Sequence, residues 1–376
     1  MIFLGGDTYQ YFYMDWYQIP RELKHAIWSE PYYDEGGGNA IMATFSVPFY
    51  QDIDGARTFR GIVTADISLT WLREIVSGGR LVEGGYRNPF HDPVALAAEE
   101  LLLRRVVGAL KDHPAIWVWN LGNEPDLFAW PENYQAGQAW VRRMVGVIRE
   151  CGGTQPVTCG LHAASLFEDN GLHIDRVFAE TDFGVMHAYP MYAPLARNPL
   201  DPDFVPFTCA VTAALCGKPV LMEEFGGCTV APGEPSQVWE WQSYDLHKKQ
   251  FMASEEDLAE FLRQTLPRLV QVGALGALVW CYADYAPELW DRPPCKEQRH
   301  ERFFGLVRPD GTLKPHARVL QEFAASRPVV QPIPPYARLK VDAEKYYRYP
   351  KANAVRAVRL VRLFKQYING LERFSK

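Results

Sequence analysis

From about residue 93 to residue 328 the chain alternates short apolar runs with longer stretches whose apolar residues have helical spacing. The helix-like stretches are 92–113, 135–150, 173–180, 205–216 and 255–271. The strand-like runs are 115–122, 155–161, 183–190, 218–226 and 273–282. This alternation predicts a parallel sheet whose strands are covered by helices on both faces. The first four runs recur about every 33 residues, which is typical of an eight-unit α/β barrel, and the longer last interval indicates an insertion around 232–250.

The two ends of the chain follow other patterns. Within 39–72, two β-rich runs flank a turn that contains Asp54 and Gly55, which predicts an antiparallel hairpin. Residues 68–77 then predict a short amphipathic helix. Beyond a Pro-rich stretch after residue 328, a basic amphipathic helix is expected over 352–374, packed on the outside of the barrel. We therefore predict three segments, 1–78, 79–328 and 329–376.

Two of the strand-like runs end in acidic residues. Residues 119–125 read WNLGNEP and residues 221–227 read LMEEFGG, so that Glu124 ends one run and Glu223 and Glu224 end the other. Catalytic groups of α/β barrels lie at the C-terminal ends of the strands. Two such ends, three units apart, can bring two carboxylates to about 5 Å, the separation that retaining glycoside hydrolysis needs. One carboxyl then protonates the glycosidic oxygen and the other attacks the anomeric carbon.

With these motifs, residues 83–328 resemble the clan A glycoside hydrolases, close to family 5 and its endo-β-mannosidase-like members. WVWNLGNEP resembles the fourth-strand motif, which implies that Glu124 is the acid/base and that Asn123 binds the sugar 2-hydroxyl. PVLMEEFG resembles the seventh-strand motif, whose nucleophile directly precedes the aromatic-Gly step, which implies Glu224 rather than Glu223. Strand alternation agrees that only one of these two neighbours faces the site.

Two further motifs extend the resemblance. MHAYP resembles the sixth strand, which implies that His187 lines the acid/base side and that Tyr189 donates to the nucleophile and keeps its pKa low. ALVWCY resembles the eighth strand, which implies that Trp280 is the sugar platform, often through a cis bond to the next residue. Residues 303–317 resemble the end of such barrels.

The resemblance covers strands four to eight only. The Arg that normally follows strand two and the His that often follows strand three have no counterpart, and Arg87 and His91 belong to a loop. The fold expected is therefore a TIM barrel of the (β/α)8 type that is incomplete. A five-strand arc of this kind has two open edges, which are a liability for solubility.

Residues 1–78 resemble the later part of a Cache sensory domain, through the segments WSEPYYD and TADIS. The resemblance implies a small α+β antiparallel fragment and a small-ligand pocket lined by Trp28, Tyr33 and Asp66. A plain strand or turn role for these three residues is the alternative. Both resemblances stop at a junction near residues 78–82.

The net charge and the aromatic content limit the classes of partner expected for this chain. A net charge of −6 argues against a nucleic-acid or anionic-membrane surface, and the 11 Trp and 19 Tyr suit either carbohydrate-binding faces or a large core. The weaker substrate-contact candidates are His162, Trp130, Trp239, Trp241 and Trp290.

The cysteines and the hydrophobic runs bear on location. Seven scattered cysteines form no CxxC pair and no zinc spacing, which is typical of reduced core thiols. The N-terminus does not read as a signal peptide and no run reaches the ~20 apolar residues of a membrane span. We expect a cytoplasmic location and no metal or organic cofactor.

The function predicted is retaining hydrolysis of mannan-like or glucan-like β-linked saccharides, weakened by the missing strands. The alternative is a catalytically inert sensory or binding protein whose Cache-like part binds a small metabolite. The oligomeric state stays open.

Overall fold

The computed structural model describes residues 15–29, 32–34, 40–53, 56–68, 87–243, 246–292, 294–347 and 353–374. Its contacts divide the chain into two compact units, 1–86 and 87–376, which are described separately. The helix predicted over 68–77 lies almost wholly outside the described residues. The segment boundaries at 78 and 328 stay predictions.

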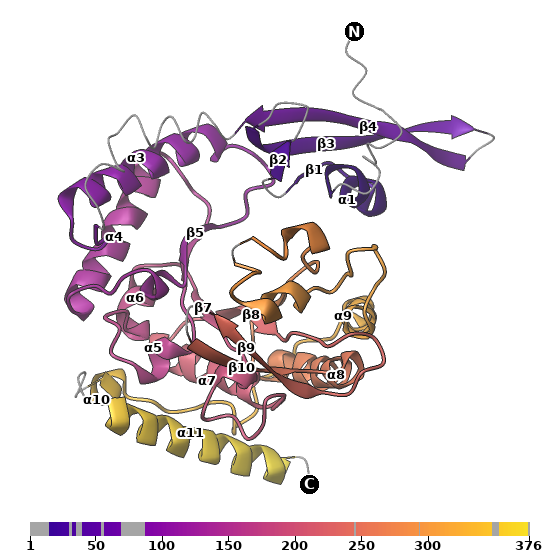
Figure 1. The fold of residues 1–376 in the computed structure, drawn as a ribbon. Helices are drawn as coiled ribbons and strands as arrows, with labels where there is room; N and C mark the ends of the chain where they lie inside the picture. The colour runs from indigo at the N-terminus through magenta and orange to yellow at the C-terminus, as the bar shows by residue number, and fades with distance from the viewer. Residues whose placement is uncertain are drawn as a thin grey trace. The chain divides into compact units, whose positions relative to one another are not determined.

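In the described residues, the first unit contains a four-stranded antiparallel sheet and one helix (Figure 1). Its elements are α1 (Asp15–Leu23), β1 (Ile27–Trp28), β2 (Tyr32–Asp34), β3 (Ala40–Ile53) and β4 (Ala56–Ser68). The long strands β3 and β4 form the hairpin predicted within 39–72, and β1 and β2 both pair with β3. Tyr17 of α1 meets Phe59 of β4 edge to face, with ring centroids 6.0 Å apart. The side chains of Trp28, Tyr33 and Asp66, the predicted pocket, lie outside the described residues.

The second unit is built on a curved set of parallel strands. They are β5 (Trp119–Asn123), β6 (Val157–Gly160), β7 (Gly184–His187), β8 (Val220–Gly226) and β11 (Gly276–Trp280). β5 pairs with β6, and β8 lies between β7 and β11. An isolated parallel bridge between His162 and His187 joins the two groups. The strands therefore follow one another in space in chain order, as successive βα units do.

The arc does not close within the part of the chain that the structure describes, where β5 and β11 each have one strand neighbour. Every residue of β6 and β7 is buried, whereas β5 and β11 alternate between partly buried and exposed residues. Leu278 in β11 is 50% exposed. The α/β class and the incomplete barrel predicted from the sequence are confirmed.

Helices cover the arc (Figure 1). They are α3 (Pro93–Leu110), α4 (Tyr134–Glu150), α5 (Ala164–Phe167), α6 (Ile174–Ala179), α7 (Phe204–Cys216), α8 (Glu255–Gln271) and α9 (Pro315–Ser326). Of these, α3, α4, α6, α7 and α8 lie at the five stretches that the periodicity predicts, whereas α5 and α9 do not. Asp92 caps α3 by accepting from the backbone of Val94 and Ala95, and Arg87 donates to the same carboxylate at 2.9 Å. Arg87 therefore supports a helix start.

The region 232–250, expected to be an insertion, contains an antiparallel pair, β9 (Gln237–Ser243) with β10 (Leu246–Met252). Trp241 points inward, is 6% exposed and donates its indole N–H to the Glu297 carbonyl at 2.9 Å. The pair was not predicted as strands, although the alternation of apolar and polar residues in QVWEWQS is compatible with a half-buried strand.

The chain ends in α10 (Ala343–Tyr347) and α11 (Asn353–Phe374). Phe364 of α11 contacts Phe207 of α7 with ring centroids 4.8 Å apart, and the buried Arg356 donates to the carbonyl of Glu168, just after α5. The predicted basic helix therefore packs on the outside of the parallel arc. Within the described ranges, no helix combines the length and hydrophobicity that a bilayer crossing requires.

Candidate active site

A cavity of about 360 Å³ opens at the C-terminal ends of the parallel strands, where barrel enzymes carry their active sites. All six residues that the sequence predicts for the site line it: Asn123, Glu124, His187, Tyr189, Glu224 and Trp280. They come from the ends of four different strands, so the arc alone assembles them.

Glu124 follows β5 in an unusual backbone conformation. Its φ of 46° and ψ of 54° are left-handed, a region that non-glycine residues seldom adopt outside functional sites. Its backbone N–H donates to the Gly160 carbonyl at 2.9 Å, and Pro125 begins a single 3-10 turn directly afterwards. The turn directs the Glu124 side chain toward His187, whose Nδ1 lies 2.8 Å from Glu124 Oε1.

Glu224 lines the cavity and Glu223 does not, as strand alternation leads us to expect, yet both side chains reach the same imidazole. His187 Nε2 lies 3.1 Å from Glu223 Oε2, and His187 Nδ1 lies 3.6 Å from Glu224 Oε1. The reason is an irregularity in β8. Met186 of β7 pairs with Met222, but the next residue, His187, pairs with Glu224, so β8 has one extra residue at this point. The pairing of β8 with β11 is irregular at the same place. A bulge of this kind re-aims side chains.

Glu223 does not line the cavity, although its side chain is 19% exposed, against 15% for Glu124 and 13% for Glu224. Asn120 Nδ2 donates to both of its oxygens at 2.9 Å, and Asn120 Oδ1 accepts from Gly160 N at 3.0 Å. Both residues support the site; Asn120 was not predicted, and Glu223 was considered only as the alternative to Glu224. The spacing of Asn120 three residues before Asn123 offered no signal beyond a polar residue in an apolar strand.

His187 is enclosed by carboxylates and its side chain is fully buried. Burial alone would lower its pKa, but the hydrogen bonds to Glu124 and Glu223 and the charge of Glu224 outweigh burial and raise the pKa to about 9. The imidazole is therefore charged at neutral pH and donates from both nitrogens. It fixes the two cavity carboxylates relative to each other.

Tyr189 donates its hydroxyl to Glu224 Oε2 at 2.8 Å. The pKa of Glu224 is nevertheless raised, because burial outweighs the opposing effects of the His187 charge and the Tyr189 hydrogen bond. The sequence resemblance implied a pKa kept low. The Tyr189 hydrogen bond does lower the pKa of Glu224, as expected, but desolvation raises that pKa by more.

His162 lies beside Glu124 and lines the cavity. Its Nδ1 is 3.9 Å from Glu124 Oε2, and its Nε2 is 2.7 Å from Asp126 Oδ2. Asn170 Nδ2 also donates to that carboxylate at 2.9 Å. Burial lowers the pKa of His162, but the hydrogen bond and charge of Asp126 outweigh it and raise the pKa. His162 is thus held beside Glu124 in the cavity wall, where its imidazole can contact a substrate.

The opposite part of the cavity includes Tyr192, Glu301 and Phe304, which sequence reasoning missed. The Tyr192 hydroxyl shares a hydrogen bond of 3.0 Å with His300 Nε2. Tyr192 follows Tyr189 of the sixth-strand motif by three residues, so its position could have been inferred from that motif. Glu301 lies in a 3-10 helix, Arg299–Phe303, and Phe304 caps its end; only the tertiary structure brings this segment near the cavity.

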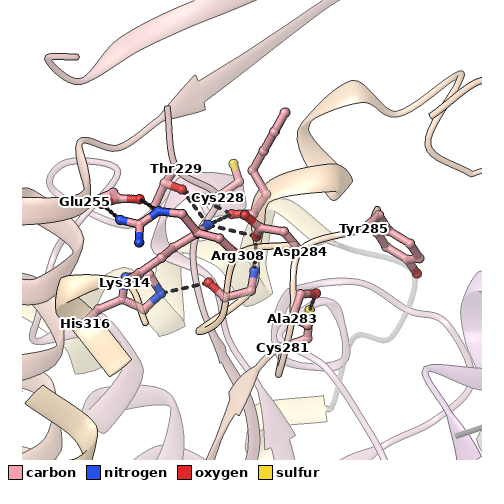
Figure 2. Close-up of polar contacts among 12 residues, drawn as sticks. Cys228, Thr229, Glu255, Cys281, Ala283, Asp284, Tyr285, Arg308, Lys314 and His316 are labelled. Atoms are coloured by element: carbon pink, nitrogen blue, oxygen red, sulfur yellow. Dashed lines mark hydrogen bonds and ion pairs between the residues drawn. The ribbon is translucent and has the colours of Figure 1, made fainter. Parts of the chain in front are cut away.

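Trp280 ends β11, is 39% exposed, and precedes a cis peptide bond to Cys281, as the eighth-strand resemblance leads us to expect. A buried polar network holds the following loop (Figure 2). Lys314 Nζ donates to Asp284 Oδ1 and to Thr229 Oγ1, each at 2.8 Å, and Gly305 N donates to Asp284 Oδ1 at 2.7 Å. The network joins the segments after β8 and β11.

The four other tryptophans considered as platforms do not line this cavity. Trp239 and Trp290 pack edge to face on Phe303, with ring centroids 5.6 and 5.4 Å away. Trp241 is buried, as described above. Trp130 is 51% exposed, and its backbone carbonyl accepts a hydrogen bond from Asn88 Nδ2. Trp280 is the one candidate of this type at the cavity.

The ligand atoms of Glu124, His187 and Glu224 all lie within 4.8 Å of one another, which is compatible in distance with a metal ion. A metal needs a neutral imidazole. Because the pKa of His187 is raised to about 9, a proton competes for that nitrogen at neutral pH. The arrangement suits proton transfer and nucleophilic attack better than metal binding.

An arc of parallel strands with two carboxylates at its C-terminal rim defines the class of TIM-barrel glycoside hydrolases. Residues 72–326 match the family described as glycosyl hydrolases family 2, TIM barrel domain, and the chain belongs to this family. The predicted glycoside hydrolase domain is therefore confirmed, with a match to family 2 where the sequence motifs indicated closeness to family 5. Residues 3–74 match the methyl-accepting chemotaxis protein-like first PDC sensor domain, which confirms the Cache-like resemblance.

Curated relatives include two mannan endo-1,4-β-mannosidases of Oryza sativa subsp. japonica. Mannosidase 4 is 27% identical over 146 residues, which is 31% of this chain and 30% of the relative. Mannosidase 3 is 30% identical over 143 residues, 31% of this chain and 29% of the relative. The matches thus span less than a third of each relative's length.

Solved structures share the fold. GH5_18 from Streptomyces cattleya in complex with GlcNAc has a TM-score of 0.53 at 19% identity, covering 73% of this chain and 65% of that one. An exo-β-1,4-mannosidase from Opitutaceae bacterium strain TAV5 has a TM-score of 0.52 at 24% identity, covering 65% and 42%. At these identities the likeness concerns the fold.

Proposed function

We propose that the chain is a retaining β-glycoside hydrolase with Glu124 as acid/base and Glu224 as nucleophile. The observation that carries the proposal is the approach of the two carboxylates, one oxygen of each lying within 4.8 Å of the other at the rim of the arc. Retaining enzymes hold their carboxyl groups about 5–5.5 Å apart, whereas inverting enzymes leave about 6.5–9.5 Å for a water molecule.

In the first step, Glu124 protonates the glycosidic oxygen while Glu224 attacks the anomeric carbon, the C–O bond to the leaving alcohol breaks, and a glycosyl–enzyme ester forms. Charged His187 orients both carboxylates through Nδ1. In the second step, Glu124 removes a proton from water, which attacks the same carbon and releases Glu224.

The remaining cavity residues bind the sugar in this proposal. Asn123 lies next to Glu124 at the end of β5 and would bind the 2-hydroxyl, and Trp280 would stack on the ring. Tyr189 holds the nucleophile through the 2.8 Å hydrogen bond. No step requires a metal or an organic cofactor.

The substrate proposed is a β-linked mannan-like or glucan-like saccharide. The names of the curated relatives, mannan endo-1,4-β-mannosidases, favour β-mannosides over β-glucosides. We expect turnover below that of a closed barrel, because the arc lacks the strands that would carry the further Arg and His around the nucleophile.

The test is hydrolysis of a panel of 4-nitrophenyl β-glycosides by the purified full chain, with the anomeric configuration of the first product followed by NMR. Retention of configuration is expected, together with loss of turnover in Glu224→Ala. For Glu124→Ala, azide should restore turnover of the activated aryl substrate and yield a β-glycosyl azide, because azide needs no general base. Inverted product, or unchanged turnover in either variant, would refute the assignment.

The match of residues 3–74 to a PDC sensor domain favours a second candidate, a sensory protein whose first unit binds a small metabolite and whose barrel is inert. A folded protein without turnover on the whole panel, but with a thermal shift on adding amino acids or small carboxylates, would support it.

A further inference from the structure

A second cavity, of about 470 Å³, adjoins the candidate active site. The two cavities share three lining residues, Ala163, Phe167 and Ala193. Ala163 and Phe167 belong to the α5 segment after β6, and Ala193 follows β7. The second cavity, called the side groove below, therefore continues the first one along its rim.

The side groove is apolar. Its walls include Leu166, Phe167, Leu195, Phe204, Leu360 and Val361. Glu168 is the single ionisable side chain among its lining residues, and the groove lacks the ring of hydroxyl and amide groups that hold successive sugars. Pockets of this volume and lining bind apolar ligands.

One wall comes from the C-terminal helix α11, which contributes Ala357, Leu360 and Val361 at helical spacing. This helix lies beyond residues 72–326, the part of the chain that matches the glycoside hydrolase family. The wall is therefore an addition of this chain to the matched domain.

The added wall is firmly held. The buried Arg356 donates to the carbonyl of Glu168, and its guanidinium lies 5.0 Å from the ring centre of Tyr347. Tyr347 in turn accepts from Ile174 N at 3.2 Å and donates to the carbonyl of Ser165 at 3.3 Å. These bonds attach α10 and α11 to the α5 segment on the opposite wall, so the groove is formed before any ligand arrives.

The position of the groove relative to the carboxylates decides what it can bind. Ala163 directly follows His162, whose Nδ1 lies 3.9 Å from Glu124 Oε2. The groove thus leads away from the proposed acid/base, and the acid/base protonates the oxygen of the leaving group. A group that reached from the cavity into the groove on this side would therefore be the one carried by the leaving-group oxygen.

We propose that the side groove binds an apolar aglycone, so that β-glycosides of long-chain alcohols are substrates of the same site that is proposed to act on β-linked saccharides. The inference rests on the proposed function and names the leaving group of that same reaction. Seven additional methylenes distinguish an octyl from a methyl aglycone. Burial of only three of them favours the octyl glycoside by about 50-fold.

The test compares methyl and octyl β-D-mannopyranoside, the latter below its critical micelle concentration, by mannose release from the full chain. The groove variant is Ala357→Trp, which places an indole into the groove from an exposed position. The matched control is Val358→Trp, at the adjacent residue of α11, which is 51% exposed and does not line the groove.

The expected result is a kcat/KM about 50-fold higher for the octyl glycoside, a loss of at least tenfold for that substrate in Ala357→Trp, and unchanged values for the methyl glycoside. Val358→Trp should match the wild type on both. Equal kcat/KM for the two glycosides in the wild type, or equal losses in both Trp variants, would overturn the inference while leaving the proposed function standing.

A second measurement separates the two proposals if neither glycoside is hydrolysed. Calorimetric binding of the same two glycosides to the full chain then tests the groove alone. Tighter binding of the octyl glycoside that Ala357→Trp abolishes would retain the groove, and the hydrolase is then judged by the aryl glycoside panel alone. Equal or absent binding of both would overturn the groove as an aglycone site.

Discussion

Replacement of Tyr189 by Phe tests how the proposed nucleophile is held. The Tyr189 hydroxyl donates to Glu224 Oε2 at 2.8 Å, and the variant removes this donor while keeping the ring. A hydrogen bond to a charged group is worth about 1.5–3 kcal/mol, and one pKa unit corresponds to about 1.36 kcal/mol. The pKa of Glu224, already raised by burial, should therefore rise by a further ~1–2 units.

The measurement is the pH dependence of kcat/KM for an aryl β-mannoside. The acidic limb of this profile reports the ionisation of the nucleophile in the free enzyme. In Tyr189→Phe the limb should move to higher pH by about 1–2 units. Activity at low pH should fall much more than activity on the plateau.

Tyr192→Phe is the matched control. Tyr192 lines the same cavity, but its hydroxyl bonds to His300 Nε2 at 3.0 Å. Its removal should leave the acidic limb in place. An unmoved limb in Tyr189→Phe, or the same movement in both variants, would refute the reasoning.

Three further changes test the surroundings of the site. The folded state raises the pKa of His187 from 6.5 to about 9, which contributes about 3 kcal/mol to the free energy of unfolding. This contribution is fully present below pH 6.5 and is lost as the pH rises through 9. Urea titrations at several pH values should show this loss of stability in the wild type and not in His187→Gln. Lys314→Met leaves Asp284 buried without its partner and should cost about 3–5 kcal/mol in the same assay, whereas a surface Lys variant should cost little. Gly226→Ala, at a φ of 150° with the added Cβ 2.6 Å from the Trp280 carbonyl, should lower both Tm and kcat/KM; an unchanged Tm would contradict this packing.

The sequence was informative where periodicity and strand ends carry the information. Helix α4 occupies Tyr134–Glu150 against a predicted 135–150, and α8 occupies the predicted 255–271, because their apolar faces repeat over several turns. The six site residues meet at one cavity because parallel strands place their C-terminal ends on one rim. Local pattern and topology were sufficient for both.

Features that depend on register or on distant segments could not be read in this way. The bulge in β8 brings Glu223 to His187, and neither neighbour of Glu223 in the sequence signals an extra residue in the pairing. Glu301 and Phe304 reach the cavity from a 3-10 helix and its end, a segment with no strand pattern. The wall that α11 gives to the side groove depends on tertiary packing, since an amphipathic helix does not specify which surface it covers.

The carboxylates around His187 also determine which charged ligands the cavity favours. Three carboxylates, those of Glu124, Glu223 and Glu224, have an oxygen within 3.6 Å of the single imidazole of His187, which is an excess of acidic groups in a partly buried place. A sugar analogue with a protonated ring nitrogen would place its positive charge against this excess, whereas the neutral parent sugar gains nothing from it. Binding of such an amine should weaken as salt is added and disappear when the amine is replaced by oxygen.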